Sequence, residues 1–233
     1  MKTVILCGGL GSRLAEETRT IPKPMVKIGN KPILSHITDI YEKNGFKEFI
    51  LALGYKSHVI KKYYLNKKSK STIHAIYTGK NTLTGGRLLK LKKYFKRGEN
   101  FMLTYGDGLT NQNIKKLLNF HLKHKKIGTM TVVRPPVRFG KVVLRKNKIK
   151  NFREKPQSTT GWINGGFFIF NYKIFDFIKG DDIMLEREPL QKLVNRGQLM
   201  AFKHTGFWQC MDTMRDKQFL NKLYKAKKAP WIS

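Results

Sequence analysis

The first residues of this chain whose types could do chemistry form a glycine-rich turn. The turn follows residues 2–6, a β-branched run that is typical of a buried strand. Glycines let a backbone bend tightly and approach a ligand, and successive N–H groups form a concave anion site. Arg13 adds a planar fork of donors and Lys23 adds a point charge, both suited to phosphate oxygens. We therefore expect a triphosphate to bind against Leu6, Cys7, Gly8, Gly9, Leu10, Gly11, Ser12, Arg13 and Lys23.

The glycines alone leave a second interpretation open, an ordinary strand-to-helix turn that binds nothing. The turn matches neither of the better-known phosphate loops. It lacks the Gly-Lys-Ser/Thr ending of one, and it does not fit the G-x-G-x-x-G spacing of the other.

A carboxylate follows a later predicted strand, residues 99–105. It is Asp107, which lies between Gly106 and Gly108. A carboxylate at a strand end suits Mg²⁺, which binds one or two carboxylates together with substrate phosphates. An Asp-Gly pair is also common in plain turns, so the motif depends on the phosphate site upstream for its functional interpretation.

Two further motifs carry polar groups. Residues 78–87 place two glycines and Arg87 before a predicted helix over 88–95, and such a loop either approaches a base or phosphate or is simply flexible. Glu186 and Glu188 either bind sugar hydroxyls or begin a predicted helix over 189–195.

The hydrophobic periodicity predicts an α/β fold. Apolar runs and helical spacing alternate along the first half of the chain, which favours a parallel sheet with helices on both faces and ligands at the carboxyl ends of the strands. No linker or repeat divides the chain, so residues 1–233 are predicted to form one domain. The other predicted strands cover 48–53, 72–77, 128–134 and 167–170, with an antiparallel pair at 138–144 and 149–153. Further helices are predicted over 32–41, 58–65 and 113–124.

Composition excludes several classes of protein. The 40% hydrophobic content is that of a globular protein, and no apolar run is long enough to span a bilayer. Two cysteines far apart in sequence are expected to be reduced thiols in a cytoplasmic protein. The net charge of +32 comes from lysines spread over nearly every segment, without a recognition motif for nucleic acid. This charge should attract small anionic substrates by electrostatic steering.

The full pattern Gly-Gly-x-Gly-Ser-Arg-Leu, followed by Lys-Pro-Met-Val, resembles the sugar-phosphate nucleotidyltransferase family, and the resemblance covers nearly the whole chain. Residues 1–64 are most similar to the branch of that family that joins CTP and glucose 1-phosphate. The resemblance implies the nucleotide-diphospho-sugar transferase fold, a Rossmann-like, mixed but mainly parallel sheet. It also implies Mg²⁺ as cofactor, CTP and glucose 1-phosphate as substrates, and no nucleic-acid or membrane partner.

The resemblance also implies roles for particular residues. Asp107 and Asp212 would hold the metal, although Asp212 or Thr213 could instead cap a helix. Arg13, Lys23 and Lys155 would be catalytic, with Lys155 of Glu154-Lys155-Pro156 on the sugar phosphate. The implied nucleotide contacts also include Thr82, Arg87 and Asp107, and the implied sugar contacts are Lys155, Asn164, Gly165, Gly166 and Glu186.

One departure from the family leaves alternatives open. The segment between Tyr64 and Thr78 is shorter than in relatives, where it contributes to subunit contacts. Formation of a homo-oligomer and the choice of base therefore stay open. The alternatives are uridylyl or thymidylyl transfer, a regulatory protein that binds nucleotides without turnover, and a nucleic-acid-binding module suggested by charge alone.

Overall fold

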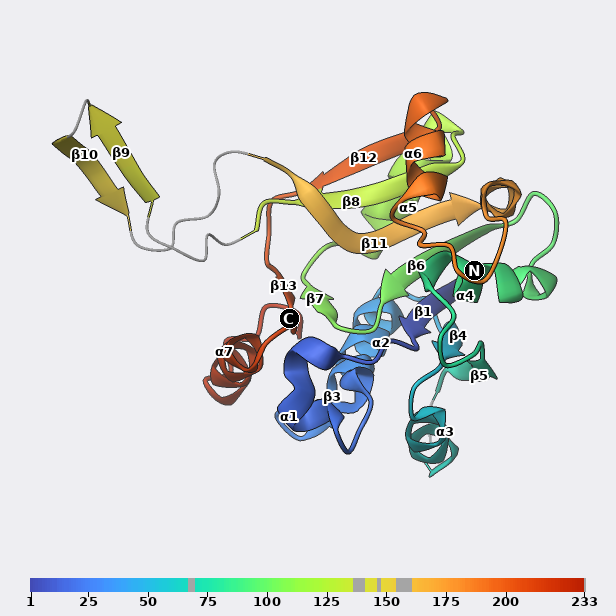
Figure 1. The fold of residues 1–233 in the computed structure, drawn as a ribbon, viewed down its shortest axis with the longest axis horizontal. Helices are drawn as coiled ribbons and strands as arrows, with labels where there is room; N and C mark the ends of the chain where they lie inside the picture. The colour runs from blue at the N-terminus through green and yellow to red at the C-terminus, as the bar shows by residue number, and fades with distance from the viewer. Residues whose placement is uncertain (67–69, 136–140, 146–147, 154–160, 233) are drawn as a thin grey trace.

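The computed structural model describes residues 1–66, 70–135, 141–145, 148–153 and 161–232 (Figure 1). Within these residues, strands from both halves of the chain form one seven-stranded sheet. Its order is β12 (Leu199–His204), β8 (Gly128–Val133), β11 (Ile163–Asn171), β6 (Asn100–Tyr105), β1 (Lys2–Cys7), β4 (Glu48–Leu53) and β5 (Thr72–Tyr77).

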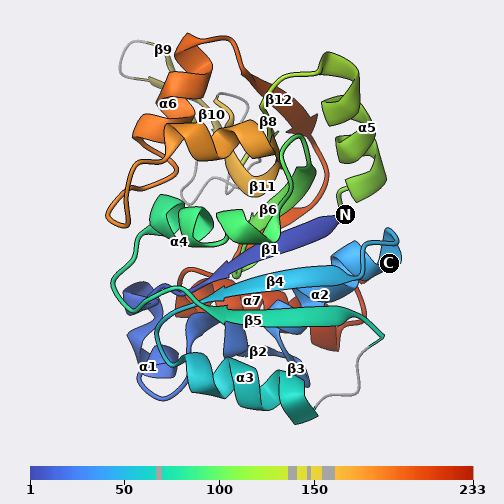
Figure 2. The same ribbon diagram turned by 90° about the vertical axis from the view of Figure 1, so that its right-hand side faces the viewer.

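The sheet is mixed but mainly parallel. Strands β6, β1, β4 and β5 are parallel neighbours, seen side by side in Figure 2, and β12 runs parallel to β8. Only β11 runs against its two neighbours, β6 and β8. The chain passes from β1 to β4 and β5 on one side and then crosses to β6 on the other side of β1. The strand order therefore reverses between β1 and β6, where α/β sheets bind their ligands.

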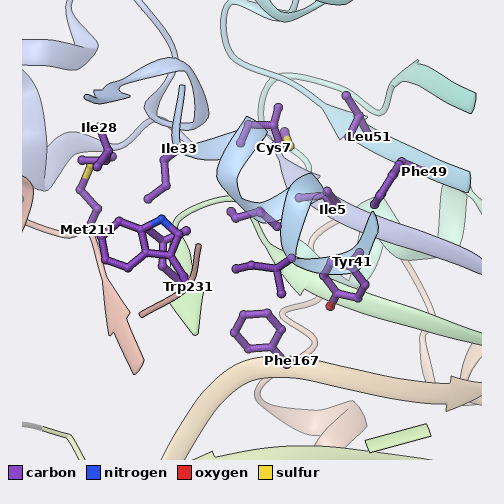
Figure 3. Packing of buried hydrophobic residues seen from close by; sticks show 14 of the residues in the cluster. Ile5, Cys7, Ile28, Ile33, Tyr41, Phe49, Leu51, Phe167, Met211 and Trp231 are labelled. Atoms are coloured by element: carbon purple, nitrogen blue, oxygen red, sulfur yellow. The ribbon is translucent and has the colours of Figure 1, made fainter. Parts of the chain in front are cut away.

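Helices cover both faces of the sheet, as the sequence predicts. Alternate side chains of a strand point to opposite faces, so Ile5 and Cys7 pack on one face while Val4 and Leu6 pack on the other. The first face buries residues of α2 (Ile33–Lys43), α3 (Ser57–Asn66), α5 (Ile114–His124) and α7 (Met214–Lys225), and part of this cluster is drawn in Figure 3. The second face buries residues of α4 (Thr84–Lys90), the 3₁₀ helix η4 (Tyr172–Phe177) and α6 (Glu188–Asn195).

Smaller elements complete the chain. Three two-stranded ladders lie outside the main sheet: β2 (Lys27–Ile28) with β3 (Lys31–Pro32), β7 (Gly108–Thr110) with β13 (Trp208–Cys210), and β9 (Lys141–Arg145) with β10 (Lys148–Arg153). Helix α1 (Ala15–Thr18) and the 3₁₀ helices η1 (Ser12–Leu14), η2 (Lys23–Met25) and η3 (Lys92–Tyr94) lie in connections. None of the helices in the described ranges has the length and apolar character needed to cross a membrane.

Most predicted elements are confirmed. The strands predicted over 48–53 and 72–77 have the same bounds in the structure, and the helices over 32–41, 58–65 and 113–124 differ by one or two residues at their ends. The antiparallel pair is also confirmed for its described residues. The strand predicted over 167–170 begins four residues earlier, at Ile163.

One predicted helix is placed wrongly. The sequence predicts it over 88–95, whereas α4 spans Thr84–Lys90 and a separate 3₁₀ turn follows at Lys92–Tyr94. Gly85 and Gly86 lie in the first turn of α4, and glycine is a poor helix former. The sequence therefore predicts that the helix begins after them. They are tolerated because the backbone of another segment packs directly against them.

The C-terminal segment is fixed to the first face of the sheet through His36. The indole N–H of Trp231 can only donate, so Nδ1 of His36, 3.1 Å away, must accept. The proton of the ring is then on Nε2, which donates to the Ile28 carbonyl at 2.9 Å. This arrangement requires a neutral imidazole, and burial lowers the pKa of His36 to about 4. Burial also lowers the pKa of His121 to about 4.

We expect the free energy of unfolding to fall as the pH drops from about 6.5 to about 4. The unfolded chain takes up protons on these histidines near pH 6.5, while the folded chain resists protonation until about pH 4. Each group should contribute roughly 3 kcal/mol across this window. Urea denaturation between pH 7 and pH 5 measures the loss, and His36→Gln should show a shallower loss than the unchanged chain. Equal slopes would contradict the assignment to His36.

Candidate active site

The predicted phosphate residues and the first predicted metal ligand lie at the carboxyl ends of β1 and β6, on either side of the point where the strand order reverses. The glycine-rich turn follows β1, and Asp107 follows β6. Register brings the two strand ends together, because Leu6 lies opposite Tyr105 and Gly106 N donates to Leu6 O at 3.1 Å. Placement of these motifs at strand ends is thus confirmed.

The glycine-rich turn leaves the sheet and presents its tip to solvent. Leu6, Cys7 and Gly8 are buried, whereas Gly9, Leu10, Ser12 and Arg13 are exposed. Gly11 has a φ of 68°, in the left-handed region that favours glycine, and its carbonyl accepts from Leu14 N and from the Thr18 hydroxyl. The turn is therefore a fixed backbone loop with an exposed rim, the shape that the phosphate prediction requires.

Arg87 lies beneath this turn and holds it. Its guanidinium donates to the carbonyl of Gly8 at 2.9 Å and to the carbonyls of Leu53 and Gly79 at 3.1 and 2.6 Å. It also contacts the hydroxyl of Thr78 and the carbonyl of Lys80. Only 4% of Arg87 is exposed. In this structure Arg87 therefore joins the carboxyl ends of β1, β4 and β5, and its predicted contact to a nucleotide stays a prediction.

The two carboxylates predicted to hold metal are brought together by the ladder of β7 and β13. Cys210 pairs with Gly108, and Met211 N donates to the carbonyl of Asp107 at 2.9 Å. Asp212 then follows two residues after the end of β13. The neighbouring Thr213 caps α7, with Asp216 completing a capping box. The capping interpretation of this motif is therefore confirmed for Thr213, and the metal-binding role of Asp212 stays a prediction.

Lys23 lies between the two carboxylates. Its Nζ is 2.6 Å from Asp107 Oδ2 and 2.6 Å from Asp212 Oδ1, and only 12% of its side chain is exposed. Arg13 NH1 donates to the other oxygen of Asp212 at 2.7 Å from a largely exposed position. The four residues thus form one ion cluster, and the contacts from the two cations to the carboxylates were not predicted from the sequence.

The electrostatics of the cluster favour the charged forms of Lys23 and Asp212. Burial acts to lower the pKa of Lys23, but its hydrogen bonds and charge attraction to Asp107 and Asp212 outweigh burial, and the pKa is raised. Burial likewise acts to raise the pKa of Asp212, but Lys23 and Arg13 outweigh it, and the pKa is lowered. At neutral pH Lys23 and Asp212 therefore carry opposite charges within the cluster.

This donor set fits Mg²⁺. Asp107 and Asp212 both contact the ammonium nitrogen of Lys23 at 2.6 Å. Their carboxylates are therefore close enough to bind one metal ion placed near that nitrogen. No group of three or more His, Cys, Asp or Glu in the described ranges is arranged to hold a metal. A pair of carboxylates without further protein ligands is what Mg²⁺ uses when substrate phosphates complete its coordination.

A small cavity of about 40 Å³ lies beside Asp107. Its wall includes Asn164, Gly165 and Gly166, the residues predicted to contact a sugar. Two hydrogen bonds fix this turn. Gly166 N donates to Asn164 Oδ1 at 2.8 Å within the turn, and Trp208 Nε1 of β13 donates to Gly165 O at 2.7 Å. The structure thus brings these three predicted sugar residues next to a predicted metal ligand.

Sequence reasoning gave no role to Tyr105 or Trp208, which also line this cavity. The hydroxyl of Tyr105 donates to Glu186 Oε1 at 2.5 Å, and burial, followed by the charge of Glu186, raises the pKa of Tyr105. The position of Tyr105 as the last residue of the strand before Asp107 could have identified it.

A second hollow of about 450 Å³ lies at the carboxyl ends of β4 and β5. It borders the glycine-rich turn, since Tyr55 N donates to the Gly8 carbonyl at 3.3 Å. Sequence reasoning did not predict this hollow either. Its lining residues are Gly54, Tyr55, Lys56, Ser57, His58, Tyr77 and Lys80.

The remaining predicted residues and the two cysteines are placed as follows. Lys155 lies outside the described residues. Thr82 is partly buried in the loop before α4, and its hydroxyl accepts from Lys90 Nζ at 3.2 Å. Cys7 and Cys210 are free thiols, and burial raises the pKa of both, that of Cys210 to about 12. Cys210 is therefore protonated at neutral pH, which agrees with the expectation that both cysteines are reduced thiols.

Comparison with known proteins identifies the protein family of this chain. The sequence profile of the nucleotidyl transferase family matches residues 2–216. The chain also shares its fold with a solved UDP-glucose pyrophosphorylase complexed with UDP-glucose, at a TM-score of 0.76 and 16% identity, with 97% of this chain and 98% of that chain covered. The chain belongs to the nucleotidyl transferase family.

Two curated relatives within this family are similar to the chain over nearly their whole length. The chain is 45% identical to the glucose-1-phosphate cytidylyltransferase of Salmonella typhimurium, over 99% of this chain and 98% of the relative. It is 40% identical to the probable glucose-1-phosphate cytidylyltransferase of Bacillus subtilis, over 99% of both chains. Both alignments extend over 253 positions, more than the 233 residues of this chain, so these relatives contain residues that this chain lacks.

Proposed function

We propose that this protein transfers a cytidylyl group from CTP to glucose 1-phosphate, giving CDP-glucose and pyrophosphate. The observation that carries the proposal is the ion cluster of Arg13, Lys23, Asp107 and Asp212 between the glycine-rich turn and the Asn164–Gly166 cavity. A nucleotide on the turn and a sugar phosphate in the cavity would meet at this cluster. The two curated relatives, similar over nearly their whole length, support the choice of substrates.

The proposed chemistry needs no general base. The attacking oxygen of a sugar phosphate is already anionic at neutral pH, so the protein has to align it with the α-phosphorus and neutralise charge. Mg²⁺, held by Asp107 and Asp212, would supply charge neutralisation at the phosphate oxygens. With phosphates bound, Lys23 and Arg13 would turn from the carboxylates to the phosphate oxygens, a short movement because the cluster lies beside the turn.

The remaining roles are assigned from position, except that of Lys155, which rests on the family resemblance alone. We assign the triphosphate to the backbone from Leu6 to Arg13, and the nucleoside to the 450 Å³ hollow beside it, near Thr82 and Arg87. We assign the glucose unit to the Asn164–Gly166 cavity with Glu186, and the sugar phosphate to Lys155. Both substrates are anions, and the net charge of +32 would draw them to the site by steering. Neither a nucleic acid nor a membrane takes part in the proposed reaction, and the two free thiols support a cytoplasmic location.

Pyrophosphate release tests the proposal. The protein is incubated with glucose 1-phosphate, Mg²⁺ and one of CTP, UTP, dTTP, ATP or GTP. We expect release with CTP to exceed release with each of the others by at least about tenfold, a discrimination that one well-placed polar contact provides. Preference for UTP or dTTP would support nucleotidyl transfer to a sugar phosphate and would show that CTP is not the nucleotide substrate. Binding of nucleotides without release from any of the five would identify a regulatory protein instead.

A further inference from the structure

The first turn of α4 is a docking site for a distant segment of the chain, residues 181–186. Leu83 N donates to Asp181 O at 2.9 Å, and Gly85 N and Gly86 N both donate to Ile183 O at 2.9 and 3.2 Å. These donors at the start of the helix are therefore satisfied by the protein itself.

The two glycines make this close approach feasible. A Cβ atom added to Gly85 would lie 2.7 Å from the Ile183 carbonyl oxygen, and one added to Gly86 would lie 2.3 Å from the Asp181 carbonyl oxygen. Both obstacles are backbone atoms, which cannot move aside as the end of a flexible side chain can. The glycines thus serve contact between two backbones, and they explain why two poor helix formers occupy a helix.

Thr84 connects this docked segment to Glu186. Its Oγ1 accepts from Leu185 N at 2.9 Å and donates its proton to Glu186 Oε2 at 2.5 Å. The other oxygen of Glu186 accepts from the Tyr105 hydroxyl, which in turn accepts from Asn164 Nδ2 at 3.3 Å. A continuous chain of hydrogen bonds therefore runs from α4 to the residues that line the cavity beside Asp107.

We propose that the Thr84-Gly85-Gly86 motif selects the sugar phosphate, by positioning Glu186 and Tyr105 at the Asn164–Gly166 cavity. This inference rests on the proposed function and adds a specificity role to it. Each oxygen of Glu186 has one protein donor and keeps a further lone pair for a sugar hydroxyl. A carboxylate fixed at both oxygens accepts only from hydroxyls in one geometry, and this arrangement penalises a sugar whose hydroxyl points elsewhere.

Thr84→Val tests the proposal, because valine keeps the shape of the side chain and removes its hydroxyl. We expect the KM for glucose 1-phosphate to rise roughly tenfold to a hundredfold, as expected for loss of one hydrogen bond to a charged group. The KM for CTP should stay within about twofold. The preference for glucose 1-phosphate over galactose 1-phosphate, which differs in one hydroxyl, should shrink. Thr84→Ser, which restores the hydroxyl, should recover both values.

Thr82→Val is the matched comparison, since it makes the same chemical change two residues away, and the Thr82 hydroxyl contacts Lys90 and not Glu186. By its predicted nucleotide contact, Thr82→Val should raise the KM for CTP and leave that for glucose 1-phosphate unchanged. A Thr84→Val enzyme whose KM rises for CTP and not for glucose 1-phosphate would overturn the proposal. So would a Thr84→Val enzyme with both KM values unchanged.

A binding measurement separates this inference from the proposed function. Calorimetric titration of glucose 1-phosphate into the unchanged protein and into Thr84→Val needs no turnover and no choice of nucleotide. Weaker binding to Thr84→Val, with an unchanged melting temperature, supports the inference even if CTP proves to be the wrong nucleotide. Equal binding to the two proteins contradicts it, and Tyr105→Phe, which removes the other donor to Glu186, repeats the test through a second variant.

Discussion

Replacing Lys23 with alanine is expected to lower turnover by about a hundredfold to a thousandfold. Lys23 is the only side chain in the described residues that contacts both Asp107 and Asp212, and it reaches them from a position with 12% exposure. A charge in such a site stabilises a developing anion far more than the same charge in water. Steady-state pyrophosphate release under saturating CTP and glucose 1-phosphate measures the effect on kcat.

The control for this variant is Lys217→Ala. Lys217 is also partly buried and also forms an ion pair, with Glu17, but that pair joins α7 to α1 and does not include Asp107 or Asp212. Turnover of Lys217→Ala should stay within about threefold of the unchanged protein, the scale of an ordinary ion pair. Near-normal turnover of Lys23→Ala, or an equal loss in both variants, would remove Lys23 from the catalytic role.

A different kind of loss is expected for Arg87→Ala, in which the free energy of unfolding should fall by roughly 3 kcal/mol or more. The guanidinium of Arg87 donates to acceptors at the ends of three strands, among them the carbonyl of Gly8. Its removal leaves buried acceptors without donors and a void beneath the glycine-rich turn, since a Cβ on Gly8 would lie 2.1 Å from the guanidinium carbon. Urea denaturation of the protein without ligands measures this change.

Two further variants test whether the loss of stability depends on the planar shape of the Arg87 guanidinium. Arg87→Lys keeps a positive charge, but one ammonium cannot reproduce the planar fork, so it should recover less than half of the lost stability. Arg215→Ala removes an exposed arginine of α7 and should change stability by no more than about 0.5 kcal/mol. If Arg87→Ala is as stable as the unchanged protein and instead raises the KM for CTP, the residue acts on the nucleotide and not on the fold.

The sequence predicts those features that depend on neighbouring residues. The strands at Glu48–Leu53 and Thr72–Tyr77 have the predicted bounds because continuous apolar or alternating segments specify them locally. The positions of the glycine-rich turn and Asp107 at strand ends follow from the same local patterns and from the rule that parallel strands end on one side. The comparisons confirm the family that these motifs resemble.

Features that depend on distant contacts could not be predicted. No local pattern states that Lys23 lies between Asp107 and Asp212, because that contact requires the pairing of β7 with β13. Likewise, Gly85 and Gly86 suggest a loop that approaches a ligand, and only the fold reveals that they admit the backbone of residues 181–183. Tyr105 and Trp208 gain their roles in the same way, from groups that reach them through tertiary structure.

The ion cluster draws on the beginning, the middle and the end of the chain, and this has a consequence for folding. Lys23, Asp107 and Asp212 can meet only after β13 has paired with β7, a contact that spans about a hundred residues. Contacts of such sequence separation form slowly, so the cluster belongs to the last stage of a refolding reaction. During synthesis on the ribosome, the nascent chain can complete its first parallel strands long before the catalytic carboxylates come together. Recovery of turnover after dilution from denaturant should therefore lag behind recovery of secondary structure.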